Sequence, residues 1–220
     1  MYLKKVISYV ASATFVIGLF PIEALSVENQ YVALRGSYGD IPSVDRDAGI
    51  YHSSNNYNSA YGIGLAYGAK MNSWLRVEGE FSYMQADLES ITNSNGVNVD
   101  ASGKETFYSL MVNAIVDWKN DTSFTPYVGA GIGGAHVSHD VTFIPTEGAD
   151  VLKADSNDVN FAWQVMLGSA YKFNETWSMD FMYRYVGIQS RTHTQDNDKP
   201  DIDMDPTHIH QAVLGMRYNF

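Results

Sequence analysis

Apolar and polar residues alternate along the last stretch of the chain, from Ala212 to Phe220. Ala212, Leu214, Met216 and Tyr218 share one face, and Gln211, Val213, Gly215, Arg217 and Asn219 share the other. Successive side chains of a strand point to opposite faces, so this stretch predicts a strand with one apolar and one mixed polar face.

Seven further stretches have a comparable length and pattern, which gives eight predicted strands. They cover residues 29–39, 59–71, 74–86, 105–118, 125–138, 159–172, 177–189 and 207–220. Each has ten or more residues, which suits a tilted crossing of a bilayer better than a soluble sheet.

The predicted connections alternate between short and long. Asn72-Ser73, 119–124 and 173–176 are short, whereas the polar segments 40–58, 87–104, 139–158 and 190–206 are long. This sorting is typical of outer-membrane barrels. The pattern predicts an all-β fold, an eight-stranded antiparallel up-and-down transmembrane barrel with short periplasmic turns and four long extracellular loops.

Aromatic residues gather near both ends of the predicted strands. Trp74, Trp118, Phe173, Trp177 and Tyr218 lie near short turns or the chain end, and Tyr38, Tyr61, Tyr83, Tyr108, Trp163 and Tyr185 lie toward the long loops. Amphipathic rings favour the two membrane interfaces, so the sequence predicts two aromatic belts.

Residues 1–26 resemble a secretory signal peptide in their order of features. Lys4 and Lys5 precede the mostly apolar stretch 6–20, and Ala24-Leu25-Ser26 offers small residues for cleavage. The alternative is a membrane anchor, but this stretch is short for a spanning helix. The predicted organisation is a signal peptide at 1–26 and one barrel domain at 27–220.

Composition narrows the possible functions. The net charge of −11 argues against nucleic acid as a partner. The chain has no Cys, so a disulfide, a thiolate metal site and lipoprotein-type lipid attachment are excluded.

Charged residues on the inward face are the first candidate site. Arg35, Lys70, Arg76, Lys172, Arg184 and Arg217 oppose Glu78, Glu80, Asp117 and Asp180. Eight strands leave room for side chains but for no wide lumen, so these charges predict an ion-pair network that plugs the barrel. A narrow ion path is the functional alternative.

Histidines at the outer rim are the second candidate. His208 and His210 share a face at the outer end of the last strand, and His136 lies toward the loops on another strand. Together with acidic loop residues, these histidines form a candidate haem or metal site. The main expectation is nevertheless that the protein binds no cofactor.

His136-Val137-Ser138 is the one pattern that suggests an enzyme. It is similar to the His-x-Ser of eight-stranded lipid A deacylases, with Glu147 as the only nearby acidic partner. The main expectation is nevertheless that the chain is not an enzyme.

Three segments resemble small outer-membrane barrels of the opacity and surface-antigen type, whose transmembrane domain is OmpA-like. They are Tyr31–Gly39, Pro126–Gly133 and the terminal Tyr218-Asn219-Phe220, in which Tyr218 and Phe220 are similar to a membrane-insertion signal. The resemblance implies a Gram-negative outer membrane, lipopolysaccharide and other membrane lipids as neighbours, and the barrel-assembly machinery as a partner. It also implies loops that bind host proteins or support envelope integrity. The expected function is therefore surface interaction, with a haem or metal binder, a lipid A-modifying enzyme and a small-pore channel as alternatives.

Overall fold

A computed structural model of the 220-residue chain describes residues 29–42, 44–48, 51–93, 98–142, 159–189, 191–193, 202–204 and 206–220. The predicted signal peptide therefore lies outside the described residues. Within them, no helix has the length and apolar character to span a membrane.

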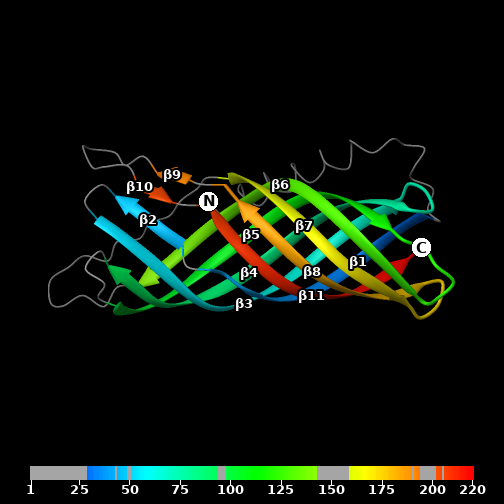
Figure 1. Cartoon of the computed structure of the whole chain (residues 1–220), viewed down its shortest axis with the longest axis horizontal. Coiled ribbons are helices and arrows are strands. Elements are labelled where there is room, and N and C mark those ends of the chain that lie inside the picture. The colour runs from blue at the N-terminus through cyan, green and yellow to red at the C-terminus, as the bar shows by residue number, and fades with distance from the viewer. Residues whose placement is uncertain are drawn as a thin grey trace, which may run out of the picture.

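Eight long antiparallel strands close into a barrel (Figure 1). They are β1 (Gln30–Asp40), β3 (Tyr51–Lys70), β4 (Leu75–Asn93), β5 (Asn98–Asp117), β6 (Phe124–Thr142), β7 (Val159–Lys172), β8 (Trp177–Ile188) and β11 (Thr207–Asn219). Each strand pairs with its neighbours, and β1 pairs with both β3 and β11. The predicted fold class is confirmed.

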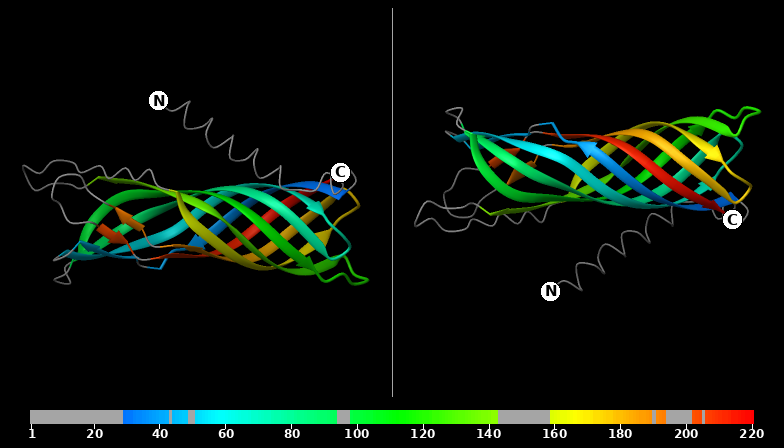
Figure 2. Two further views of the ribbon diagram at one scale, coloured as in Figure 1. Left: turned by 90° about the horizontal axis from the view of Figure 1, so that it is seen from above. Right: turned by 90° about the horizontal axis from the view of Figure 1, so that it is seen from below.

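Three short turns lie at one end of the barrel, together with the C-terminus (Figure 2). We call this the short-turn end and the opposite end the loop end. Asn72 and Asn174 shape two of these turns, because each side-chain oxygen accepts backbone N–H bonds of 2.8 and 2.9 Å. All strand boundaries at this end lie within one residue of the predicted ones.

The loop end differs from the prediction because strand structure continues into segments expected to be loops. β3, β4, β5 and β6 extend into them, and β2 (Val44–Ala48), β9 (Arg191–His193) and β10 (Ile202–Met204) add to the same sheet. The prediction of loops throughout 40–58 and 87–104 is therefore wrong. An antiparallel ladder needs only backbone groups, so it continues where apolar alternation has stopped.

The added strands keep the register of the barrel. Gly39 pairs with Ala60, and Val44 pairs with Asn55 in the same register, so β2 continues β1. In the same way β10 continues β11 against β2, and β9 continues β8 against β10. The wall of the barrel thus extends past its apolar band.

The outer face carries that apolar band between two groups of aromatic rings. Exposed aliphatic and aromatic side chains form the band: Leu34, Ile63, Leu65, Phe81, Ile132, Val165, Leu167, Phe181, Leu214 and Met216. Trp74, Trp118, Phe124, Phe173 and Trp177 flank it at the short-turn end, and Tyr38, Tyr61, Tyr108 and Tyr183 flank it at the loop end. A band of this kind fits hydrocarbon between two polar interfaces.

Leu214→Arg should lower the free energy of unfolding in lipid vesicles by about 2–4 kcal/mol, because Leu214 lies in the middle of the band. Val159→Arg is the matched control, since Val159 is comparably exposed (60% against 51%) but begins β7 at the loop end. It should cost at most about 1 kcal/mol. Equal losses in a denaturant titration would contradict a membrane-embedded band.

Candidate functional site

The centre of the barrel interior is built on β4, which directs Arg76, Glu78 and Glu80 inward at alternate positions. Arg35 on β1 lies opposite and forms two bonds to Glu78, at 2.7 and 2.9 Å. The same guanidinium donates a 2.7 Å bond to Glu80. All four side chains are at least 98% buried, so these are full ion pairs shielded from solvent.

Neighbouring strands supply the remaining partners of the two glutamates. Arg184 on β8 donates to Glu80 at 2.5 Å, and Asn113 on β5 donates to Glu78 at 3.0 Å. Gln164 on β7 donates to Asn113 at 2.6 Å, and Gln211 on β11 accepts from Arg184 at 2.7 Å. The network therefore joins strands from around the whole barrel.

A second group of pairs lies nearer the short-turn end. Arg76 forms two bonds to Asp117, at 2.8 and 2.9 Å, and Arg217 pairs with Asp180. Tyr31 lies between the two arginines, with guanidinium carbons 5.6 and 4.9 Å from its ring centroid, and donates to Glu78 at 3.0 Å. Such cation–π contacts help to offset the cost of burying charge.

Two predicted members lie outside this buried network. Lys172 is half exposed and pairs with Glu175 in a short turn at 2.7 Å, which lowers the pKa of the Glu175 carboxyl. Lys70 ends β3 and is only partly buried. Of the predicted charges, four arginines and four carboxylates remain in the interior, in place of the expected six against four, and Glu105 on β5 is a further buried carboxylate that was not predicted.

Nearly all polar atoms of the network have partners. In the described part of the chain, the buried side-chain polar atoms without a hydrogen bond are Arg35 Nε, Tyr127 Oη and Asn219 Oδ1. Glycines make the room for the large groups: a Cβ at Gly68 would overlap the ring of Tyr31, and one at Gly131 would overlap Asn113. In this arrangement each of the four buried arginines is paired with a carboxylate.

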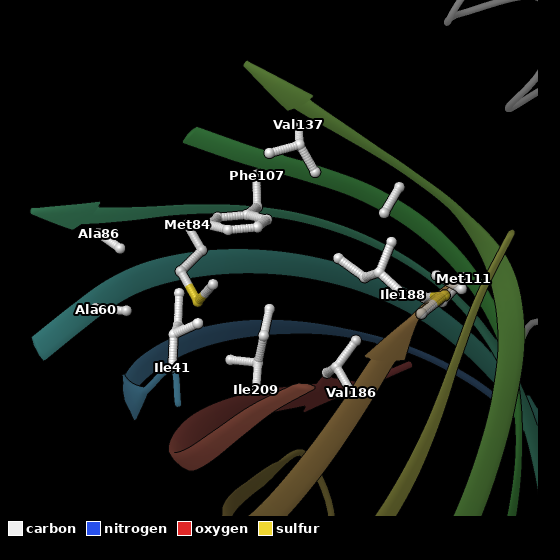
Figure 3. Close-up of a cluster of buried hydrophobic side chains, with 12 residues drawn as sticks. Ile41, Ala60, Met84, Ala86, Phe107, Met111, Val137, Val186, Ile188 and Ile209 are labelled. Carbon is white, nitrogen blue, oxygen red and sulfur yellow. The ribbon is translucent and has the colours of Figure 1, made fainter. Parts of the chain in front are cut away.

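The interior toward the loop end is mostly apolar, with the buried Glu105 opposite Ala86, and the sequence reasoning missed this. Met84, Phe107, Val137, Ile188 and Ile209 point toward one another there (Figure 3). The full cluster, which we call the apolar layer, is Ile41, Ala60, Met84, Ala86, Phe107, Met111, Ala135, Val137, Ala162, Val186, Ile188 and Ile209. The available signal was the change on β4 from inward Arg76, Glu78 and Glu80 to inward Met84 and Ala86.

The rim histidines do not form one cluster. His208 and His210 lie together on β11, where their Nδ1 atoms are 2.7 Å from Tyr185 Oη and 2.6 Å from Tyr183 Oη. His136 lies on β6, three strands away, with its ring 6.3 Å from that of Tyr108. Within the described residues, no three or more His, Cys, Asp or Glu are placed to hold a metal.

His136 and Ser138 alternate with the buried Ala135 and Val137, so both face outward. Their suggested partner, Glu147, lies outside the described residues. Tyr218 and Phe220 form an edge-to-face pair at 5.3 Å at the chain end, and Tyr218 also contacts Trp177 at 5.0 Å. Their role as an insertion signal stays a prediction.

A family model described as outer membrane protein beta-barrel domain matches residues 12–220. A Brucella abortus protein of uncharacterized role is 27% identical over 196 residues, or 74% of this chain and 68% of that protein. The outer membrane protein PagN of Salmonella typhimurium is 30% identical over 131 residues, or 56% of this chain and 54% of PagN. A Rickettsia bellii protein named as a candidate adhesin is 25% identical over 146 residues, or 64% of each chain.

Solved structures share the fold. Neisserial surface protein A superposes with a TM-score of 0.53 and 17% identity, and OprG from Pseudomonas aeruginosa with 0.56 and 12%. Each match covers 87% of this chain and 97% of the other. At these identities the likeness supports the architecture alone.

Glu80→Gln should destabilise the barrel by roughly 3–5 kcal/mol, because it removes the carboxylate that pairs with two buried arginines, Arg35 and Arg184. Glu80→Gln combined with Arg184→Gln removes one charge of each sign and should recover part of the loss. Glu175→Gln is the control, in an exposed pair where no measurable change is expected. Denaturant unfolding of the four proteins measures this, and a double variant no better than the single one would refute coupling across the interior.

Proposed function

The chain belongs to the outer membrane protein β-barrel family and resides in the outer membrane. On that premise, we propose that it is a surface-interaction protein built on a plugged barrel. The segments 40–58, 87–104, 139–158 and 190–206 face outside and bind host or other extracellular proteins. The barrel itself contributes to envelope integrity.

The relatives support this proposal through their names. PagN is an outer membrane protein, and the Rickettsia bellii relative is named as a candidate adhesin. The extended loop end supports it through geometry. β2, β9 and β10 join the lengthened β3–β6 in one register-matched sheet, which extends past the apolar band. Binding segments commonly rest on such rigid scaffolds.

The interior supports a plug over a channel. In support of a plug, ion pairs occupy the part toward the short-turn end, and the apolar layer packs in the part toward the loop end. An ion that crosses would have to separate buried pairs and then enter an apolar constriction, which repels water. Side-chain packing thus disfavours the small-pore alternative.

The remaining alternatives have weaker support. A deacylase would need an acidic partner for His136 and Ser138. A rim metal site would need further ligands beside His208 and His210, and among the residues that the structure describes no three or more His, Cys, Asp or Glu are placed to hold a metal. We therefore infer a protein without catalytic activity and without a cofactor. We also infer that residues 1–26 are an export leader, that Tyr218 and Phe220 are read by the barrel-assembly machinery, and that lipopolysaccharide surrounds the outer rim.

Replacing each outward segment in turn with a short Gly-Ser linker should reduce adherence of a non-adherent Gram-negative host that expresses the full chain. The segment that carries the contact should cost most of the binding, since its side chains are removed while the barrel remains. The measurement is the number of bacteria bound to cultured host cells.

The control replaces residues 119–123 in a short turn, which should leave adherence unchanged because that turn faces the periplasm. Surface labelling confirms that each variant is exported. If all four segment variants adhere as well as the unaltered chain, the proposed function is wrong.

In planar bilayers the unaltered chain should show no steady conductance, and neither should the charge-balanced Glu80→Gln/Arg184→Gln variant. The apolar layer remains intact in both. Met84→Ser combined with Phe107→Ser, at directly paired positions within that layer, should admit water and give measurable openings. A steady current through the unaltered chain would instead establish the channel.

A further inference from the structure

A group of aromatic rings lies on the outer face of β7, β8 and β11 at the loop end; we call it the His–Tyr patch. It consists of Trp163, Tyr183, Tyr185, His208 and His210. Tyr185 is central: its ring stacks on His208 at 5.7 Å and 16°, and lies 5.0 Å from His210 and 5.4 Å from Trp163. The patch is a continuous aromatic surface directly above the apolar band.

Each imidazole in the patch keeps one nitrogen for an outside partner. Nδ1 of His208 is hydrogen-bonded to Tyr185 Oη, and Nδ1 of His210 is hydrogen-bonded to Tyr183 Oη. A phenol is a stronger proton donor than a neutral imidazole, so it donates to Nδ1 and places the imidazole proton on Nε2. A protonated imidazole carries that same proton, so Nε2–H remains a donor in both charge states.

Arg35, Arg76, Arg184 and Arg217 are buried inside the barrel, and the Lys side chains that the structure describes lie at the short-turn end. At the loop end, the outward basic side chains that the structure describes are His136, His208 and His210. An anionic group that meets this described part of the rim therefore has imidazole as a hydrogen-bond partner.

The groups that face the two histidines differ. On the β8 side, Tyr185 contacts both imidazole rings and Tyr183 contacts His210 alone. On the other side, the exposed Asp40 of β1 lies directly opposite His210. His208 has Gly187 opposite on β8, and the ladder between β1 and β11 ends before it. The carboxylate of Asp40 beside His210 repels a second anion, so His208 is the better hydrogen-bond donor to an anion.

We propose that the His–Tyr patch binds the phosphorylated sugar headgroup of an outer-leaflet glycolipid. Sugar rings have apolar faces that pack on aromatic rings, and their phosphates accept hydrogen bonds from Nε2–H. The position of the patch is that of the interface, where the apolar band ends. The inference rests on the outer-membrane location and does not require adhesion.

The test uses the full chain folded in neutral detergent, with bisphosphorylated lipid A and fully dephosphorylated lipid A as probes. Dissociation constants are measured by native mass spectrometry. The unaltered chain should prefer the phosphorylated probe. His208→Gln with His210→Gln should weaken that binding about tenfold, and His208→Gln alone should account for most of the loss.

His136→Gln is the matched control, because it removes an outward histidine three strands away and should change nothing. Heat-modified mobility on gels verifies that each variant forms a closed barrel. Tyr183→Phe with Tyr185→Phe keeps the rings but removes both phenols, and should give an intermediate loss in affinity.

Four outcomes would overturn the inference: equal affinity for both probes, unchanged binding in the histidine double variant, displacement by millimolar inorganic phosphate, or haem binding that the double variant loses while lipid A binding persists. Adherence separates this inference from the proposed function. The histidine variants should adhere normally, so equal affinity of the unaltered chain for both probes, together with intact adherence, counts against the patch alone.

Discussion

Hydrocarbon offers no hydrogen bonds, so each backbone group of a spanning strand has to find its partner within the sheet. The pairing of β1 with both β3 and β11 meets this requirement by leaving the spanning sheet without an edge. The two faces then have fixed environments, because side chains alternate. One face meets lipid along the apolar band, and the other faces a lumen that eight strands make too narrow for bulk water.

The interior meets that constraint in two ways. Toward the short-turn end, Glu78 of β4 pairs with Arg35 of β1, and Glu80 pairs with both Arg35 and Arg184 of β8. Toward the loop end Met84 and Phe107 pack in the apolar layer, where Gln211 Nε2 also donates a 2.9 Å hydrogen bond to Met84 Sδ. Buried ion pairs add less stability than an apolar core of equal volume, but they depend strictly on position. The network therefore favours one strand register, and the apolar layer adds burial energy.

Sequence reasoning captured what a period of two can encode. Strand ends at the short turns, the outward belts and the inward placement of Arg76, Glu78 and Glu80 all follow from alternation bounded by turn residues such as Asn72. It failed where alternation is uninformative. The strand segments beyond the membrane are short or rich in polar residues, as in Ser53-Ser54-Asn55-Asn56, and their ladder depends on backbone register. Lys172 has the parity of a lumen residue, but its flexible stem reaches Glu175 in the adjacent turn.

Contacts between strands were also beyond reach, because they depend on register that one sequence does not reveal. His208 and His210 are visible as a pair in the sequence. Their phenol partners on β8 can be identified only once the register is known, in which His210 lies opposite Tyr185. That pairing converts two isolated imidazoles into oriented donors on an aromatic surface. The same closed ladder that excludes the backbone from lipid therefore also determines which side chains meet the membrane surface, and in what chemical state they meet it.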